Sequence, residues 1–352
     1  MLNIPVLSII VPSYNMEKYL PKCLGSLVVA PELMDRLEVL VVNDGSKDRT
    51  SEIAHDFASK WPRTFKVIDK PNGNYGSCIN AALPLATGVF VKVLDADDWF
   101  DTDAFEQFIK RLIDLQDPLP DLVLTDYDEV DEDGEILRHI VMPYAEGVRF
   151  TVSEFLAKWQ GVQMHAIAYR TDLLRAMAYK QLEGVSYTDT EWAVLPISAV
   201  ETAVRFPEVV YKYLVGRAGQ TMDLSKRVVS WWMRGAVALD MARKFVSVSG
   251  ECEQSVRDSL FRRIESELED TYRVAIFGMH GHKANIDLDD FDRQVRSVSP
   301  MLYDKLNTAV YSRKLPYCYI KAWRERSVRR YVMLPLCKAY TKLAMTVKKW
   351  VH

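Results

Sequence analysis

Short apolar runs alternate with helical patterns over residues 1–130. Five runs are apolar at nearly every position and predict buried strands at 6–11, 37–42, 65–68, 89–94 and 122–125. The stretches between them carry apolar residues at helical spacing and predict helices at 17–29, 48–60, 76–86 and 102–115, the last with Thr102 as its N-cap. This alternation indicates βαβ crossovers, so we expect an α/β domain whose mostly parallel sheet is covered by helices on both faces.

The pattern changes after residue 130. Residues 131–134 are typical of a turn, and further strands are predicted at 127–130, 136–141 and 209–215. Helices are predicted at 151–159, where Thr151 or Ser153 lies near the start, and at 226–246, 253–277 and 288–298. The switch to helical spacing places a boundary within 217–225. We therefore expect an α/β domain at 1–220 and a helical C-terminal extension at 221–352.

The composition is that of a folded protein, with 49% hydrophobic and 26% charged residues. The five cysteines are scattered without a CxxC pair, which argues against a zinc ribbon or a disulfide framework and favours a reducing compartment. The N-terminus lacks the basic and cleavage regions of a signal peptide. No apolar run approaches the ~20 residues that span a bilayer. We expect a cytoplasmic protein without a nucleic-acid partner.

The charge is divided unevenly along the chain. Residues 313–352 hold eleven Lys or Arg and one acid, a net charge of +10 in a chain whose net charge is -3. Residues 324–351 also contain aromatic and aliphatic side chains, interrupted by Pro335, which is typical of an amphipathic segment at a membrane surface. Anionic lipid attracts such a segment by ~1 kcal/mol per basic residue. We expect peripheral binding to the inner face of a membrane, the alternative being a helix that packs on the acidic body or on a partner.

Polar loops follow three of the predicted strands. They are Pro12-Ser-Tyr-Asn, Asn43-Asp-Gly-Ser and Asp95-Ala-Asp-Asp, after the first, second and fourth strands. Ligands of open α/β sheets bind beyond the carboxyl ends of the strands. The sequence therefore predicts that these loops converge on one binding site.

The third loop places three carboxylates, Asp95, Asp97 and Asp98, within four residues. Such close like charges raise one another's pKa unless a cation neutralises them. Oxygen ligands suit Mg²⁺ or Mn²⁺, which leave coordination positions for phosphates. The D-x-D spacing thus favours a complex of metal and nucleotide diphosphate. The alternative is a solvated turn or a helix N-cap, above all for Asp98.

The other two loops carry groups that suit a nucleoside. Asp44 is predicted to accept a hydrogen bond from a uracil imide or a ribose hydroxyl, and Gly45 lets a base approach the backbone. Tyr14 is predicted to stack on the base. The alternatives are ordinary turn chemistry for Asn-Asp-Gly-Ser and packing of Tyr14 on the following helix.

Four segments together resemble the family 2 glycosyltransferases of the GT-A fold, a Rossmann-like sheet. The matching segments are Ser8–Asn15 (SIIVPSYN), Glu38–Asp48 (EVLVVNDGSKD), Asn80–Gly88 (NAALPLATG) and Val93–Asp98 (VLDADD). Their order and spacing make the joint match strong although each segment is short. The resemblance covers residues 1–130 well and 131–216 more loosely, and it leaves out the C-terminal part.

The resemblance implies an inverting enzyme that transfers a sugar from a nucleotide-diphosphate sugar to a saccharide or lipid-linked acceptor in cell-surface polysaccharide synthesis. A UDP-sugar is the favoured donor. It implies donor-binding roles for Pro12, Tyr14, Asp44, Asn80 and Asp95, and Mn²⁺ or Mg²⁺ ligands in Asp97 and Asp95. The flexible polar segment after the strand at 209–215 adds Arg217 or Gln220 as an expected contact of the donor diphosphate. Arg217 and Gln220 belong to a predicted lid at 216–222, whose alternative is an ordinary interdomain loop.

The general base is expected in Thr188-Asp189-Thr-Glu-Trp192, where Asp189 takes the base position. Thr188 replaces the usual Glu, so Glu191 is a competitor for this role. His165 is predicted to be a hydrogen-bonded structural residue, the alternative being a contact with the acceptor or the metal.

Two further departures concern the donor loops. Asn43 replaces a frequent Asp, which we expect to be tolerated. Ile79 replaces a frequent Arg, so that Lys70, Lys92 or the metal would have to hold phosphate.

Other classes fit less well. A dinucleotide-dependent dehydrogenase needs G-x-G-x-x-G after the first strand, and a nucleotidyltransferase needs a Gly-rich basic loop there; Val11-Pro-Ser-Tyr-Asn is neither. A degenerate GT-A fold that serves as a non-catalytic binding or scaffold subunit is the remaining alternative, because the base motif is altered while the D-x-D is intact.

Overall fold

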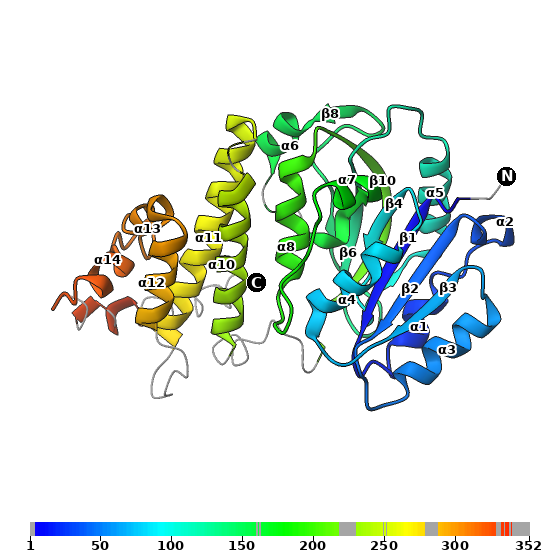
Figure 1. The fold of residues 1–352 in the computed structure, drawn as a ribbon, viewed down its shortest axis with the longest axis horizontal. Coiled ribbons are helices and arrows are strands. Elements are labelled where there is room, and N and C mark those ends of the chain that lie inside the picture. Colours follow the sequence, from blue (N-terminus) through cyan, green and yellow to red (C-terminus); the bar gives the residue numbers. More distant parts are fainter. Residues whose placement is uncertain are drawn as a thin grey trace. The chain divides into compact units, whose positions relative to one another are not determined.

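The computed structural model describes residues 4–217, 230–278 and 288–328 except 160, 162, 249 and 251, together with 332, 333, 335–337 and 339. The chain divides into two compact units. One unit comprises Met1–Gln220 with Cys252–Arg257, and the other Thr221–Glu251 with Asp258–His352. The first is an α/β unit and the second is helical (Figure 1).

The first unit is built on one sheet, whose parallel core confirms the predicted fold class. Four parallel strands stand in the order β3 (Phe65–Asp69), β2 (Leu37–Asn43), β1 (Leu7–Ser13) and β4 (Phe90–Val93). The sheet continues through β9 (Ile167–Arg170), β6 (Leu122–Val130), β10 (Thr202–Leu214) and β5 (Trp99–Phe100). Strands β7 (Ile136–Ile140) and β8 (Arg149–Thr151) pair with β6 and β10.

The antiparallel strands were not all predicted. Strand β9 runs antiparallel between β4 and β6, and β5 and β8 pair antiparallel with β10. Strand β6 joins the two runs predicted at 122–125 and 127–130, and β10 begins seven residues before the predicted 209–215. These strands are short or half-polar, so their apolar pattern is weak.

Eight α-helices surround the sheet in the described part of this unit (Figure 1). They are α1 (Leu20–Gly25), α2 (Pro31–Met34), α3 (Thr50–Lys60), α4 (Asn74–Ala82), α5 (Thr102–Ile113), α6 (Val152–Lys158), α7 (Thr171–Ala176) and α8 (Asp189–Val194). Of the helix predicted at 17–29, only residues 20–25 form α1. The short helix α2 then begins at Pro31.

The helix caps correct one prediction and confirm another. Asp101, not Thr102, caps α5, since its side chain accepts the N–H of Ala104 at 3.1 Å. Thr151 caps α6 and forms a capping box with Glu154. At α5, the Asp101 carboxylate therefore accepts the N–H group that was expected to bind the Thr102 hydroxyl.

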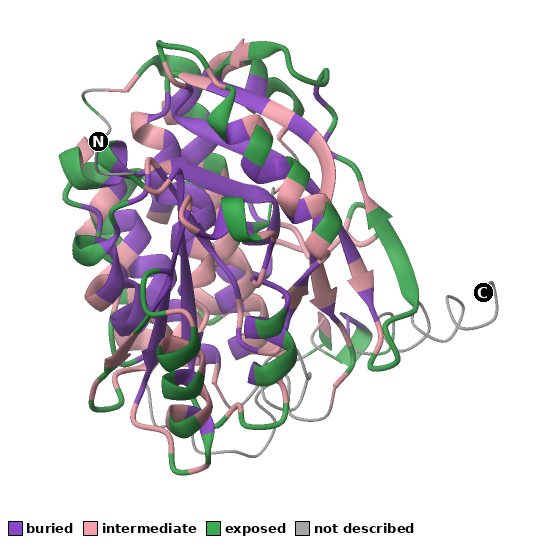
Figure 2. Cartoon of the chain, turned by 90° about the vertical axis from the view of Figure 1, so that its right-hand side faces the viewer, coloured by how far each residue is buried: buried purple, intermediate pink, exposed green. Residues whose placement is uncertain are grey.

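The central strands form the core. Every residue of β1 and β2 is buried, and Figure 2 shows buried ribbons through the middle of the sheet. Each fully buried aliphatic side chain contributes about 1.5–3 kcal/mol. In contrast, β7 is exposed along most of its length. The stable middle of the sheet therefore fixes the strand ends from which the polar loops begin.

The second unit contains α10 (Trp231–Val248), α12 (Leu288–Val298), α13 (Pro300–Leu306), α14 (Tyr319–Arg324) and most of α11 (Gln254–Gly278). These helices agree with those predicted at 226–246, 253–277 and 288–298 within the residues described. Tyr272 and Phe291 meet edge to face in its core, 5.3 Å apart. Within the described residues, no helix has both the length and the apolar character needed to cross a bilayer.

Candidate active site

Strand register brings the three polar loops to one edge of the sheet. Ser13 pairs with Asn43, and Ile10 pairs with Val93, so β1, β2 and β4 end side by side. The first two loops also bind each other, because the N–H of Lys47 donates to Asn15 Oδ1 at 2.8 Å. The convergence predicted for Pro12–Asn15, Asn43–Ser46 and Asp95–Asp98 follows directly from this register.

Two of the three acids of the D-x-D loop, Asp95 and Asp98, bind different tyrosines. Tyr75 donates its hydroxyl to Asp95 Oδ1 at 2.8 Å. Asp98 is 1% exposed and accepts the Tyr211 hydroxyl at 2.6 Å and the Leu214 N–H at 2.8 Å. Asp98 is therefore neither a solvated turn residue nor an N-cap, but a buried acceptor that anchors the end of β10.

The electrostatics of this loop call for a cation. Burial and the charge of Asp97 raise the pKa of Asp95 to about 7. Burial, Asp97 and Asp95 raise the pKa of Asp98 well above its usual range. A divalent cation reverses such shifts, because it stabilises the ionised carboxylates.

The donor set around Asp95 fits a metal. Oxygens of Asp95 and Asp98 and a ring nitrogen of His165 lie within 4.8 Å of one another. His165 is 7% exposed, and its buried Nδ1 has no hydrogen-bond partner among the residues that the structure describes. Burial, aided by Lys92, lowers the pKa of His165 to about 3, so its imidazole is neutral, the form that binds metals.

The ammonium groups of Lys92 and Lys70, the two lysines considered for phosphate binding, both bind other groups of the protein. The Lys92 ammonium is fully buried and donates to the carbonyls of His165 at 2.5 Å and Ile167 at 3.3 Å. Burial lowers its pKa to about 7. Lys70 Nζ lies 2.6 Å from Asp44 Oδ1. Neither lysine thus presents its ammonium to a ligand in this structure.

Asp44 organises the loop that follows β3. Besides Lys70, its two oxygens accept the side-chain amide of Asn72 at 3.0 Å and the N–H groups of Gly73 and Asn74, each at 2.9 Å. A carboxylate offers about four lone-pair positions, and these four donors occupy them. The predicted contact with uracil would have to displace one of them.

The residues predicted to line the base pocket lie at the carboxyl end of β1 and just beyond it. Pro12 is buried at the end of β1, and Tyr14 follows it with 44% of its surface exposed. The Tyr14 ring is therefore accessible to a ligand, and its stacking on a base stays a prediction.

Asp189 is the first residue of α8, and it faces the acid cluster electrostatically. Burial is the main cause of the raised pKa of Asp95 and of Tyr75, and the Asp189 charge adds to both shifts. Tyr187, two residues before Asp189, has a φ of 73°. Such backbone strain in a non-glycine residue is concentrated at functional sites.

Glu191 and Asn80 hold the chain that leads to α8. Glu191 is fully buried and accepts the Leu182 N–H at 2.8 Å. The Asn80 amide pairs with both backbone groups of Gln181, at 2.8 and 2.9 Å. These contacts favour supporting roles for Glu191 and Asn80, and they leave Asp189 as the half-exposed acid of the motif.

Gly76 lets α4 approach this same segment. A Cβ on Gly76 would lie 2.1 Å from the carbonyl oxygen of Leu182, closer than any real contact. Only glycine permits the observed packing at this position.

Arg217 reaches the acid cluster from beyond β10. Its Nε donates to Asp97 Oδ2 at 2.5 Å, and its guanidinium lies over the Tyr19 ring at 5.3 Å. Arg217 thus lies at the D-x-D motif, a contact that was not predicted; its predicted contact with the donor diphosphate stays a prediction, and Gln220 lies outside the described residues.

Sequence reasoning missed four tyrosines around the cluster. Tyr75 and Tyr211 bind Asp95 and Asp98, Tyr213 stacks on His165 at 4.2 Å, and Tyr19 lies beneath Arg217. The alternation of tyrosines 211 and 213 on one strand was the only sequence feature that placed two of them on one face.

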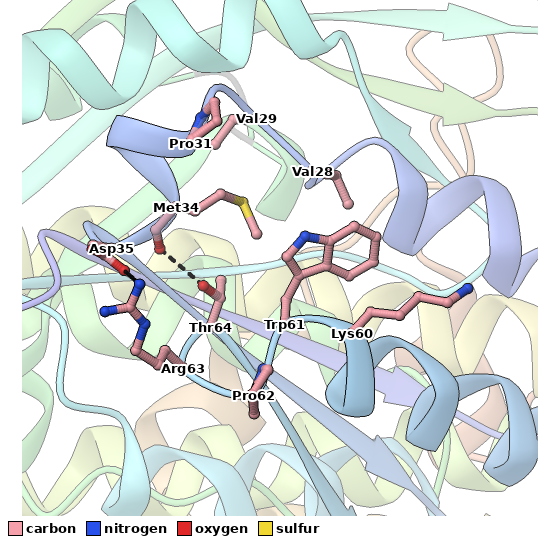
Figure 3. Close-up of a pocket in the computed structure, with 10 residues that line it drawn as sticks. All are labelled: Val28, Val29, Pro31, Met34, Asp35, Lys60, Trp61, Pro62, Arg63 and Thr64. Atoms are coloured by element: carbon pink, nitrogen blue, oxygen red, sulfur yellow. Dashed lines mark hydrogen bonds and ion pairs between the residues drawn. The ribbon is translucent and has the colours of Figure 1, made fainter.

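A separate cavity of about 410 Å³ lies away from these loops (Figure 3). Trp61, Met34 and Val28 line it together with an ion pair between Arg63 and Asp35, 3.2 Å apart. These residues precede β2 and β3, so the cavity lies at the amino ends of the strands. It is not part of the candidate active site.

Comparison with known proteins agrees with this geometry. Residues 8–156 match the family model described as glycosyl transferase family 2. An uncharacterised glycosyltransferase of Mycoplasma pneumoniae, the MG025 homolog, is 39% identical over 102 residues, which are 28% of this chain and 34% of that protein. The chondroitin synthase of Pasteurella multocida is 35% identical over 135 residues, which are 38% of this chain and 14% of that protein. The match thus spans about a third or less of these relatives.

The fold resembles that of S. aureus TarS 1-349, whose structure was solved in complex with UDP-GlcNAc. The TM-score is 0.58 at 19% identity, over 96% of this chain and 91% of that chain. This likeness concerns the fold, and the family model concerns the sequence of the donor loops. Together they show a glycosyl transferase family 2 domain at residues 8–156, in a chain whose fold is that of the GT-A glycosyltransferases.

Proposed function

We propose that the chain is an inverting glycosyltransferase that transfers a sugar from a nucleotide-diphosphate sugar to a hydroxyl of a saccharide or lipid-linked acceptor. The observation that carries the proposal is the convergence of Asp95, Asp97, Arg217 and Asp189 at the carboxyl edge of the sheet. A UDP-sugar is the favoured donor, because the similar TarS fold was solved with UDP-GlcNAc. The likeness to a chondroitin synthase supports a role in cell-surface polysaccharide synthesis.

The donor would lie across the three loops. Pro12 and Tyr14 border the base, and Asp44 keeps the 70–74 segment in place beside it. Asp95 faces the ribose and Arg217 the diphosphate, to which its planar guanidinium is suited. In this proposal Asn80 acts on the donor through the segment at 181–183 that it binds.

A Mn²⁺ or Mg²⁺ ion would be held by Asp97 and Asp95, and His165 has a ring nitrogen within 4.8 Å of an Asp95 oxygen. When bound, such an ion stabilises negative charge on the departing diphosphate. Tyr75 restrains the Asp95 carboxylate through its hydroxyl, and the buried Asp98 fixes the loop through its hydrogen bond from Tyr211. These contacts pre-organise the ligand oxygens.

Asp189 would act as the general base. It would take the proton of the acceptor hydroxyl while that oxygen attacks the anomeric carbon and the bond to the diphosphate breaks on the opposite side. A single displacement of this kind inverts the anomeric configuration, as in inverting hydrolysis with an alcohol in place of water. Glu191 is less suited to this role because it is fully buried and binds backbone.

The test is turnover with a panel of UDP-sugars, Mn²⁺ and saccharide acceptors, followed as UDP release. We expect wild type to turn over at least one donor, and Asp189→Asn to retain UDP binding while losing transfer. Unchanged turnover in Asp189→Asn would move the base elsewhere. UDP binding without turnover of any donor by wild type would favour the non-catalytic scaffold.

We propose a peripheral location on the inner face of an anionic membrane through residues 313–352. In the described part of this segment, Val328, Val332 and Leu336 are 78%, 63% and 51% exposed. Arg324 and Arg326 instead pair with Asp292 and Asp289 inside the second unit. The exposed apolar side chains, not these two arginines, therefore support the membrane contact.

A further inference from the structure

The guanidinium of Arg217 lies at an oxygen that the proposed metal would need. Arg217 Nε and Asp97 Oδ2 are 2.5 Å apart, and the two side chains are only 16% and 15% exposed. The ring of Tyr19 lies 5.3 Å from the guanidinium, within the ~6 Å range of cation–π attraction. Two contacts from different parts of the chain thus hold this cation on the D-x-D loop.

The guanidinium and a metal ion compete for Asp97, because Arg217 already binds its Oδ2. A divalent ion on this carboxylate would lie within a few ångströms of the guanidinium, in a site where burial weakens screening. The acidic surroundings remain suited to a cation, because oxygens of Asp95 and Asp98 and a ring nitrogen of His165 lie within 4.8 Å of one another, and His165 Nδ1 has no hydrogen-bond partner among the described residues. The site is therefore built for a divalent ion but holds an arginine at one of its ligands.

We propose that Arg217 is an exchangeable counter-ion: it neutralises Asp97 before the donor binds and transfers to the donor diphosphate when metal and nucleotide bind together. This inference rests on the proposed function. A diphosphate offers the guanidinium the same kind of paired oxygens as a carboxylate. The metal alone has to displace Arg217 without giving it a new partner, whereas the metal with nucleotide provides one.

The consequence is cooperative loading of the donor site. The metal alone binds weakly, and UDP strengthens metal binding by the same factor by which the metal strengthens UDP binding. Premature metal binding is disfavoured, and the complete donor complex releases Arg217 from Asp97. Arg217 is thus a positioning residue whose position depends on the donor.

The experiment measures Mn²⁺ binding to the full chain from the electron paramagnetic resonance of free Mn²⁺, with and without UDP. Arg217→Gln should bind Mn²⁺ alone ~5–150-fold more tightly than wild type, the usual range of coupling between sites. The strengthening by UDP should shrink in this variant. Lys18→Gln is the matched control, because it removes a positive charge beside Tyr19 that does not contact Asp97, and it should leave Mn²⁺ binding unchanged.

Equal binding of Mn²⁺ alone by wild type and folded Arg217→Gln overturns the exchange. An equally large effect of Lys18→Gln also overturns it, since general electrostatics would then suffice. If Arg217→Gln does not fold, Arg217→Lys provides the test: it keeps the charge but loses the planar contact, and should bind Mn²⁺ alone more tightly than wild type. Failure of every variant to bind Mn²⁺ even with UDP refutes the proposed donor site itself.

Discussion

Replacement of Asp44 by Asn distinguishes a carboxylate that holds the fold from one that only contacts a ligand. Asp44 is 3% exposed at its side chain and pairs with Lys70, whose side chain is 19% exposed. It also accepts hydrogen bonds from Asn72, Gly73 and Asn74. An Asn amide retains the size but has one acceptor oxygen, and its NH₂ group faces donors.

The magnitude follows from these contacts. Breaking a buried ion pair by removing one partner costs about 3–5 kcal/mol. Lys70 keeps two neutral acceptors, the Pro71 carbonyl and Ser77 Oγ, so the lower part of that range is expected. For a unit of this size, 1 kcal/mol shifts Tm by about 2–4 °C, so Asp44→Asn should lower the transition of the α/β unit by roughly 6–12 °C.

The assay is differential scanning calorimetry of the metal-free chain, with Asp69→Asn as the matched control. Asp69 also accepts three side-chain hydrogen bonds, but its side chain is 46% exposed, and its loss should cost less than about 1 kcal/mol. An unchanged Tm together with lost UDP binding in Asp44→Asn would refute this reasoning. Asp44 would then serve as a base contact, as the family resemblance implies.

Three further predictions concern pH, packing and the membrane. Burial and the charge of Asp97 raise the pKa of Asp95 from its ordinary value of 3.8 to about 7, so the folded chain holds an extra proton between these values. The metal-free protein should therefore lose stability as pH rises from 4 to 7, and the slope of Tm against pH should be smaller in Asp95→Asn. Gly76→Ala should destabilise by about 1–3 kcal/mol in urea unfolding, because its Cβ meets the Leu182 carbonyl, whereas Gly25→Ala, with nothing within 4 Å, should be neutral or slightly stabilising. The intact protein should sediment with vesicles containing anionic lipid and not with neutral vesicles, and a variant with Val328, Val332 and Leu336 changed to Ser should sediment less; equal sedimentation of that variant would contradict the membrane contact.

The sequence predicts the parallel core and the position of the site because both depend on local patterns. Continuous apolar runs identify β1, β2 and β4, and the strand-end rule then places their loops together. It also identifies Asp95, Asp97 and Asp98 as an acidic cluster. These features require no knowledge of contacts between distant residues.

The partners of individual polar groups could not be predicted in this way. Nothing local shows that Asp98 binds Tyr211, which is 113 residues away, or that Asn80 binds Gln181, which is 101 residues away. The short strand β9 lies antiparallel in the middle of the sheet. Its four residues are too few for a hydrophobic pattern that would predict a strand. The sequence therefore indicates which hydrogen bonds Asp44 or Asn80 can form, but the tertiary structure decides which groups they bind.

The most direct test of the central claim is calorimetric titration with UDP, with and without Mn²⁺, of wild type and Asp97→Ala. The account predicts that wild type binds UDP when Mn²⁺ is present, that binding is much weaker without the ion, and that Asp97→Ala loses the Mn²⁺-dependent part. Absence of UDP binding by wild type under both conditions would contradict the claim that the acidic strand-end loops form a metal-assisted UDP-sugar site.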